Sequence, residues 1–264
     1  MRIARVAYKG ANRYGIIEKD RIQFLAAPPF DGIHRTQEFA ALADVKLLPP
    51  TEPVNFWGVG FNYPSHLHQA QETSGQSLPT MPRPWQKGVG SMIGPDEAVL
   101  IPPEATAVHY EGELVIVISK RARRLTAKEA ASYILGYTIG NDVSEKGSWE
   151  RDGTMWRAKN TDTFGPVGPW IETDIDPGNQ ILTVRLNGKV MDTTNTAQMI
   201  HKPHDLVAYM SQFTTLFPGD LILTGASGET VAMKPGDVCE VEISGIGVLR
   251  NPIEAEPMRR TSSS

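Results

Sequence analysis

The sequence predicts a β-rich α+β fold. Several segments have the length and the apolar, β-branched composition of strands, at residues 97–102, 113–119, 136–142, 181–191, 219–225 and 238–250. Few segments have the composition of helices, and the 264 residues include 24 glycines and 20 prolines, which are typical of turns. Many short strands separated by turns indicate that sheets form most of the core.

Residues 1–50 are expected to form a small N-terminal β/α domain. Residues 1–27 predict short strands joined by turns at 10–12 and 18–20. The stretch QEFAALADVK, residues 37–46, predicts a short helix. The proline-rich stretch 48–55 predicts a linker that closes this unit.

Residues 51–257 are expected to form one larger catalytic domain, followed by a disordered tail at 258–264. Two helices are predicted in it, at 126–134, where Thr126 can cap the amide of Glu129, and at 204–213. The Asn-Gly-Lys sequence at 187–189 is typical of a tight hairpin turn. Residues 58–84 combine a short helical turn with a proline-rich loop, and we expect them to be a lid that orders over bound ligand.

Composition and charge exclude several classes of protein. The formal net charge of -4 and the pI near 5.9, without any basic run, give no electrostatic basis for binding nucleic acid or an anionic membrane. No apolar stretch approaches the roughly 20 residues that span a bilayer, and the N-terminus lacks a signal-peptide core, so a cytoplasmic protein is expected. The single cysteine, Cys239, excludes an internal disulfide framework and is expected to be buried.

Two carboxylates stand at the start of a strand that otherwise has a fully apolar sequence. Glu111 and Glu113 are two residues apart, so they point to one face, with Gly112 on the other. Since like charges repel and are costly to bury alone, a positive group is expected between them. Asp142, at the end of the strand at 136–142, would complete an all-oxygen site for Mg²⁺, Mn²⁺ or Ca²⁺ rather than Zn²⁺. Spacing alone leaves solvated strand-end carboxylates as an alternative.

Several motifs follow one another in the order seen in a known enzyme family. They are HYEGELVIVISK at 109–120, GYTIGNDVS at 136–144, WRAKNTDTFGPVGPWI at 156–171, FPGDLILTGASG at 217–228 and VEISGIGVLRNPI at 241–253. With the upstream blocks GVGFNYPSHLHQ and PWQKGVGSMIG, the chain resembles the fumarylacetoacetate hydrolase family from about residue 54 to residue 253. The resemblance implies that family's mixed β-sheet roll with a small N-terminal domain, and a homodimer.

The resemblance also implies a metal-dependent enzyme that acts on small 2-oxo acids or their enols. It assigns Glu111, Glu113 and Asp142 to a divalent cation, Mg²⁺ or Mn²⁺, which supplies the positive charge expected above. It assigns catalytic roles to Lys159, whose ammonium stabilises a developing enolate, and to His66, a base that deprotonates water. Residues matched to substrate-binding positions are Tyr63, Lys87, Lys146, Thr224 and Gly225.

The chain departs from the family pattern at positions near the substrate. Gln69 stands where a glutamate commonly orients the lid histidine, and Glu72 is one helical turn further on. Lys146 stands near the usual arginine and Trp149 near the usual glutamine. After Thr224-Gly225 the chain has ASGET in place of the usual Thr-Pro. The metal ligands are therefore intact, whereas the substrate contacts are altered.

The residues and the resemblance together lead to one expected function and two alternatives. The first is hydrolysis of a C–C bond in a 3-acylpyruvate-type 2,4-diketo acid, with water activated by His66. The second is decarboxylation or isomerisation of a 2-oxo or 2-hydroxydienoic acid, which needs no activated water and is favoured by Gln69. The third is a non-catalytic ligand-binding protein, which the intact carboxylates and Lys159 argue against.

Overall fold

The computed structural model describes residues 1–65 and 80–257. Its largest element is a 12-stranded sheet with the order β4-β3-β2-β1-β14-β12-β11-β17-β6-β7, in which β5 pairs with β1 and β8 with β14. The strands are β1 (Arg2–Tyr8), β2 (Ala11–Glu18), β3 (Arg21–Leu25), β4 (Arg35–Ala41), β5 (Lys46–Leu47), β6 (Phe56–Gly60), β7 (Arg83–Lys87), β8 (Met92–Ile93), β11 (Gly112–Ile118), β12 (Ile134–Asn141), β14 (Gly165–Glu172) and β17 (Leu221–Leu223). The predicted β-rich fold is confirmed.

A second, 5-stranded sheet has the order β16-β15-β18-β19-β9. It comprises β9 (Val99–Ile101), β15 (Ile181–Leu186), β16 (Lys189–Asn195), β18 (Val238–Ile243) and β19 (Gly247–Ala255), and a separate short pair joins β10 (Val108–His109) to β13 (Ser144–Glu145). Most neighbouring strands are antiparallel, but β6 and β17, β8 and β14, and β9 and β19 run parallel. The expected mixed topology is thus present.

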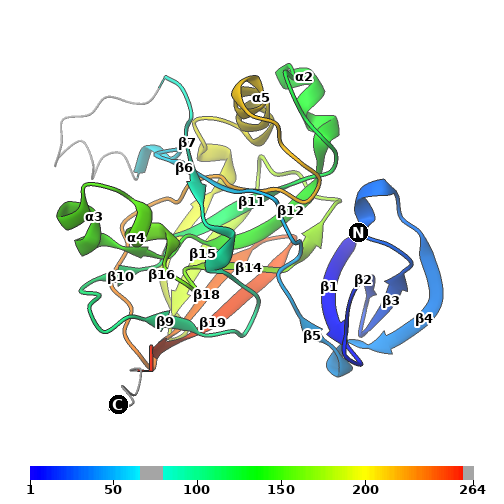
Figure 1. The fold of residues 1–264 in the computed structure, drawn as a ribbon, viewed down its shortest axis with the longest axis horizontal. Coiled ribbons are helices and arrows are strands. Elements are labelled where there is room, and N and C mark those ends of the chain that lie inside the picture. Colours follow the sequence, from blue (N-terminus) through cyan, green and yellow to red (C-terminus); the bar gives the residue numbers. More distant parts are fainter. Residues whose placement is uncertain (66–79, 258–264) are drawn as a thin grey trace, which may run out of the picture.

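The helices are short and lie at the periphery of the sheets (Figure 1). They are α2 (Ala127–Ala130), α3 (Lys146–Asp152), α4 (Trp156–Asn160) and α5 (Pro203–Phe213), with 3₁₀ turns at Pro29–Asp31, Leu42–Asp44, Val89–Ser91, Ala131–Tyr133 and Thr196–Gln198. Helices α2 and α5 lie together at one end, whereas α3 and α4 lie at another (Figure 1). No helix in the described ranges is long and apolar enough to cross a membrane.

Strand β11 lies in the middle of the core and is buried on both faces. Leu114, Ile116 and Ile118 pack in a cluster with side chains of the 5-stranded sheet and of α5. Val115 and Val117 pack on the opposite face with residues of β14, β17 and the N-terminal strands. Burial on both sides explains why this strand has an uninterrupted apolar sequence instead of an alternating one.

Three local predictions for the catalytic part are confirmed. Thr126 caps α2, since the Glu129 amide donates to Thr126 Oγ1 at 3.3 Å. Residues 203–213 form α5. Asn187 and Gly188 have φ values of 55° and 76°, the left-handed conformations of a two-residue hairpin turn between β15 and β16.

The helix predicted at 37–46 is wrong. Residues 35–41 form β4, and residues 42–44 form a 3₁₀ turn. The backbone pairs with β3, with Gln23 opposite Phe39 and Leu25 opposite Arg35. Pairing with a preceding strand therefore overrides the helical preference of this alanine-rich stretch, which is a tertiary effect.

The N-terminal strands continue the large sheet. Strand β1 pairs with β14, with Ile3 opposite Ile171, and the N-terminal amine lies 2.6 Å from Glu172 Oε1. Figure 1 shows this unit, in blue, at one side of the molecule. The predicted lid falls largely on residues 66–79 and the predicted tail on 258–264, which lie outside the described residues.

Gly112 connects the fold to the carboxylates. A Cβ atom at this position would lie 2.7 Å from Val184 Cγ2 and 2.9 Å from Val241 Cγ1, so the strand can approach the 5-stranded sheet only without a side chain. We expect Gly112→Ala to destabilise the protein by about 2 kcal/mol, because overpacking of a buried strand costs about 1–3 kcal/mol. Thermal unfolding should show a lower Tm. Gly90→Ala is the control, since no atom lies within 4 Å of its Cβ position; equal Tm values for the two variants would contradict this packing argument.

Candidate active site

The structure brings Glu111, Glu113 and Asp142 together. Glu111 precedes β11 and Asp142 follows β12, and the antiparallel pairing of Gly112 with Asn141 sets the two carboxylates side by side. The Asp142 amide donates to the Glu111 carbonyl at 2.8 Å. One carboxylate oxygen from each of the three residues lies within 4.8 Å of the others, and all three side chains are buried.

Neighbouring backbone groups hold this carboxylate cluster in position. Asn141 Oδ1 accepts a hydrogen bond from the Glu111 amide at 2.8 Å. The Gly225 amide donates to Glu113 Oε2 at 2.5 Å. Gly225 has a φ of +102°, and a Cβ atom there would lie 2.8 Å from Asn62 Cβ, so the close approach of this loop requires glycine.

Lysine side chains surround the carboxylate cluster. Lys159, on α4, has its Nζ 2.6 Å from Glu111 Oε2 and 2.5 Å from Asp142 Oδ2. Lys87, at the end of β7, has its Nζ 2.7 Å from Asp142 Oδ1. Lys146, half exposed at the start of α3, lies 3.3 Å from Glu111 Oε1.

The pKa values follow from burial and from these charges. Burial raises the pKa of Glu113 well above its usual value, and the charges of Asp142 and Glu111 raise it further, against the effect of Lys159. Burial alone would lower the pKa of Lys159, but the adjacent Asp142 and Glu111 carboxylates outweigh it and raise that pKa. The protein's own groups thus keep Lys159 charged and leave Glu113 short of positive charge.

The carboxylate cluster fits a divalent cation. Its donors are all carboxylate oxygens, the ligands that Mg²⁺ and Mn²⁺ prefer. A cation held by Glu111, Glu113 and Asp142 would supply the positive charge that the buried Glu113 lacks. Such a set of three protein ligands leaves coordination positions for a substrate.

Lys87 is buried next to Asp142 of the carboxylate cluster. Its side chain is 0% exposed, and its Nζ donates to Asp142 Oδ1 and, at 2.6 Å, to the carbonyl oxygen of Lys159. The ammonium groups of Lys87 and Lys159 lie 5.7 and 5.4 Å from the centroid of the Trp85 ring. In this arrangement Lys87 contacts Asp142 and the backbone of Lys159, and the substrate contact expected from sequence stays a prediction.

We expect Lys87→Met to lower kcat about ten-fold with little change in KM, because the lost ammonium orients catalytic groups and the substrate contacts other residues. Steady-state kinetics at saturating Mg²⁺ would measure both constants. Lys46→Met is the control, since Lys46 is exposed and pairs with Glu97 far from this site. A raised KM with an unchanged kcat would instead assign Lys87 to substrate binding.

Thr224 and Gly225 lie beside the carboxylate cluster with their donors engaged by protein. The Thr224 hydroxyl donates to the Leu114 carbonyl at 2.9 Å, and the Gly225 amide donates to Glu113. Contact of either donor with a substrate carboxylate therefore requires these hydrogen bonds to exchange. Both residues therefore lie beside the carboxylate cluster, and their contact with a substrate stays a prediction.

Tyr63 is buried and lies near the carboxylate cluster. Its hydroxyl has no hydrogen-bond partner among the described residues. Burial, and then the charges of Glu113 and Asp192, raise its pKa, so it remains a neutral phenol. His66, Gln69 and Glu72 lie outside the described residues.

Trp156, His109 and His204 each have different surroundings. Trp156 is 73% exposed on α4. His109 Nδ1 lies 3.0 Å from Thr230 Oγ1, and burial lowers its pKa. His204 lies 3.4 Å from Asp205 at the exposed start of α5.

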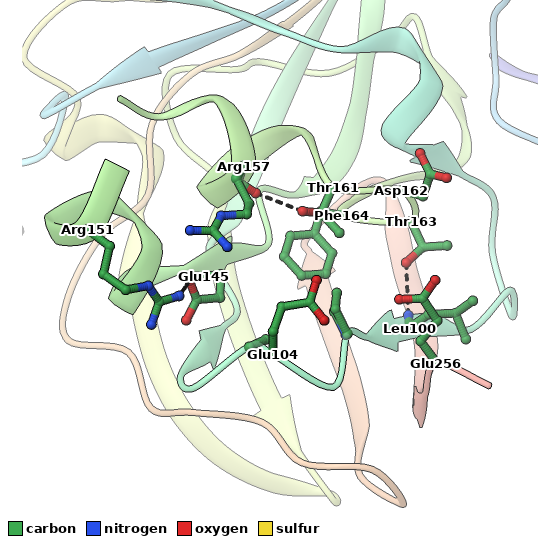
Figure 2. A pocket seen from close by; sticks show the side chains of 12 residues that line it. Leu100, Glu104, Glu145, Arg151, Arg157, Thr161, Asp162, Thr163, Phe164 and Glu256 are labelled. Carbon is green, nitrogen blue, oxygen red and sulfur yellow. Dashed lines mark hydrogen bonds and ion pairs between the residues drawn. The ribbon is translucent and has the colours of Figure 1, made fainter. Parts of the chain in front are cut away.

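A separate pocket of about 340 Å³ lies beside α3, α4 and β9 (Figure 2). Glu145 in its wall accepts hydrogen bonds from Thr106 and pairs with Arg151 at 3.4 Å. Burial alone would raise the pKa of Glu145, but hydrogen bonds from Ser148 and Thr106 outweigh it and lower that pKa to about 2. The three carboxylates of the cluster do not line this pocket, so it is a distinct feature.

Sequence reasoning missed α3 and α4, which carry Lys146 and Lys159. Both are short, and α3 contains Gly147, whose Cβ position would lie 2.2 Å from Thr106 Oγ1. Two side chains of α3 bind Glu145, the residue directly before the helix, and stabilise it. Arg151 donates to the Glu145 carboxylate, and Ser148 donates to the Glu145 carbonyl. Thr106, at a separation of 39 positions, fixes Glu145 in turn through a hydrogen bond to its carboxylate, a tertiary contact without a local sequence signal. Sequence reasoning also did not single out Asp192 and Ser227, whose side chains form a hydrogen bond. The ASGET departure did point to the loop that contains Ser227.

Comparison with known proteins identifies the family. Residues 55–254 match the model described as fumarylacetoacetate (FAA) hydrolase C-terminal, and residues 1–50 match the model described as Rv2993c-like, N-terminal. The chain is 35% identical over 218 residues to the mitochondrial oxaloacetate tautomerase Fahd2a of Rattus norvegicus, covering 78% of this chain and 68% of that protein.

Solved structures agree with this assignment. The 5-carboxymethyl-2-hydroxymuconate delta-isomerase of Mycobacterium smegmatis is 37% identical, with a TM-score of 0.90 and coverage of 97% of this chain and 100% of that one. The maleylpyruvate hydrolase of Sphingobium sp. SYK-6, solved with manganese(II) and pyruvate, is 25% identical, with a TM-score of 0.78 and the same coverage. These proteins are enzymes, and this chain belongs to the fumarylacetoacetate hydrolase family.

Proposed function

We propose that the protein is a divalent-metal-dependent isomerase that interconverts keto and enol forms of a 2-oxo acid. The observation that carries this proposal is the position of Lys159, whose buried ammonium lies 2.6 Å from Glu111 and 2.5 Å from Asp142. Isomerisation comes first because the relatives at 35% and 37% identity are named a tautomerase and an isomerase, whereas the hydrolase is 25% identical.

In this proposal the residues of the carboxylate cluster hold the cation and the lysine stabilises developing charge. A bound Mg²⁺ would act as a Lewis acid toward the 2-oxo oxygen. Lys159 Nζ, kept charged by Glu111 and Asp142, donates a hydrogen bond where negative charge develops on that oxygen. His66 moves the proton at the neighbouring carbon, a role that rests on its sequence position.

Hydrolysis of a C–C bond in a 3-acylpyruvate is the second candidate. It uses the same carboxylates and Lys159, and it needs in addition a water molecule deprotonated by His66. The named maleylpyruvate hydrolase with manganese(II) and pyruvate supports this chemistry on the same fold.

The test compares both reactions in one preparation. Protein stripped with EDTA and then supplied with Mg²⁺ or Mn²⁺ is given the enol form of phenylpyruvate, and separately acetylpyruvate. Loss of enol absorbance reports isomerisation, and mass spectrometry reports acetate and pyruvate from cleavage. We expect metal-dependent enol conversion; cleavage without it would favour the hydrolase, and neither reaction with either metal would refute both.

A further inference from the structure

The loop after β17 joins the carboxylate cluster to a further carboxylate, that of Asp192. At one end of this loop the Gly225 amide donates to Glu113 Oε2 at 2.5 Å. At the other end Ser227 Oγ donates to Asp192 Oδ2 at 2.7 Å, and Asp192 lies on β16 of the 5-stranded sheet. These are the residues where ASGET replaces the family's usual Thr-Pro, so the link through Ser227 belongs to this chain's own sequence.

The loop backbone lies directly against the Asp192 carboxylate. A Cβ atom at Gly228 would lie 2.9 Å from both Cγ and Oδ1 of Asp192, and Gly228 has a φ of +65°. The Gly228 amide donates to Ser65 Oγ at 3.2 Å, which brings in the segment that leads to His66. Asp192 is therefore held at a fixed place between this loop and the end of the Tyr63–Ser65 segment.

Tyr63 is near enough to both Glu113 and Asp192 for their charges to act on it. Its side chain is buried, with 1% of the residue exposed, and both Glu113 and Asp192 act on its hydroxyl electrostatically. That hydroxyl has no hydrogen-bond partner within residues 1–65 and 80–257. A buried hydroxyl without a partner costs about 1–3 kcal/mol, so a polar group of a ligand is its natural partner.

The loop residues that contact Glu113 and Asp192 are only two positions apart. Two residue steps, from Gly225 to Ser227, span at most about 7 Å, since an extended chain rises about 3.3–3.6 Å per residue. A 2-oxo acid whose head lies at Glu113 and whose carbon chain follows this loop would therefore extend toward Asp192.

Within residues 1–65 and 80–257 the carboxylate of Asp192 has no ion-pair partner. Lys159 pairs with Glu111 and Asp142, and Lys87 pairs with Asp142. In the described part of the chain no lysine, arginine or histidine forms an ion pair with Asp192, whose side-chain hydrogen bond comes from Ser227. A ligand carboxylate placed there would meet a like charge at a site with limited access to water.

We propose that Asp192 determines specificity by disfavouring a second carboxylate, so that the site takes 2-oxo acids whose distal substituent is uncharged. This inference rests on the proposed function, because it places the 2-oxo acid head at the carboxylate cluster. It separates this chain from the relatives named for oxaloacetate and for a carboxymethyl-hydroxymuconate, whose substrates carry an additional carboxylate.

The test uses acids that differ only in the distal group. 2-Oxopentanoate and 2-oxoglutarate have the same five-carbon chain, ending in a methyl group or in a carboxylate. Isothermal titration calorimetry of the Mg²⁺-loaded protein should give a Kd about ten-fold lower for 2-oxopentanoate. Asp192→Asn, which keeps an oxygen acceptor for Ser227, should tighten 2-oxoglutarate about ten-fold and change 2-oxopentanoate less than two-fold.

Ser227→Ala is the matched control. It removes the hydrogen bond and keeps the charge, so the preference for 2-oxopentanoate should persist. In the unaltered protein added NaCl should reduce the preference, a result that does not depend on the folding of any variant. Equal binding of the two acids, or an unchanged ratio in Asp192→Asn, would overturn the inference alone. Binding of neither acid would overturn the proposed function together with it.

Discussion

Lys159→Met is expected to lower kcat by about a thousand-fold. The ammonium of Lys159 is held between Glu111 and Asp142 at 2.6 and 2.5 Å and is kept charged there. In the proposed reaction it donates to the oxygen on which negative charge develops, and removing one such donor from a water-poor site costs about 10²–10³ in rate. Steady-state kinetics at saturating Mg²⁺, with enol and acylpyruvate substrates, would measure the loss.

A control on the same helix separates catalysis from folding. Trp156→Ala changes a 73% exposed side chain on α4 and should keep a native kcat. Lys159→Met also removes the positive charge between Glu111 and Asp142, so the metal-free variant should unfold at a lower temperature, and Mg²⁺ should raise its Tm more than that of the native protein. A native kcat in Lys159→Met would contradict the assigned role.

Glu113→Gln is expected to weaken Mg²⁺ binding by more than about a hundred-fold and to abolish metal-dependent turnover. Loss of a charged ligand removes one of three carboxylates in an all-oxygen site. Because burial and the charges of Asp142 and Glu111 penalise the ionised form of Glu113, the neutral amide should leave the metal-free Tm equal to or above that of the native protein. Calorimetric titration with Mg²⁺ and thermal unfolding of the metal-free protein measure the two effects.

Glu145→Gln is the matched control for a buried carboxylate outside the carboxylate cluster. Glu145 has a pKa lowered to about 2, because hydrogen bonds to its ionised form outweigh burial. A lowered pKa in the folded state means that ionised Glu145 stabilises the protein above the unfolded-state pKa near 4.5, and that this contribution is lost as the pH falls toward 2. Glu145→Gln should therefore lower the Tm at neutral pH while Mg²⁺ binding stays native. Native Mg²⁺ binding in Glu113→Gln together with weakened Mg²⁺ binding in Glu145→Gln would refute the site assignment.

Much of the fold follows from local patterns. The hairpin at Asn187-Gly188 and the cap of α2 by Thr126 depend on turn and capping chemistry that neighbouring residues supply by themselves. The helix expected at 37–46 does not form, because pairing with β3 outweighs its local preference. Helices α3 and α4 were missed because both are short, and because Glu145, which Arg151 of α3 contacts, is held by Thr106 at a separation of 39 positions.

The three carboxylates of the cluster were predicted to lie together from the sequence alone, and the structure brings them together. Glu111 and Glu113 flank Gly112 at the start of β11, a spacing that points both to one face in extended backbone, and Asp142 directly follows the strand that pairs with β11. The family and the candidate catalytic lysine were likewise evident from motif order, and the family match confirms the former.

Only the tertiary structure decided which side chains from elsewhere in the sequence contact Asp142 of the carboxylate cluster and the nearby Asp192. Lys87 contacts Asp142 across 55 positions, and Ser227 contacts Asp192 across 35 positions. A lysine after a loop and an aspartate in an exposed-looking strand have no local pattern that reveals such partners. Their roles depend on burial and distance, because a charge acts strongly only where the fold excludes water and brings a partner within a few ångströms.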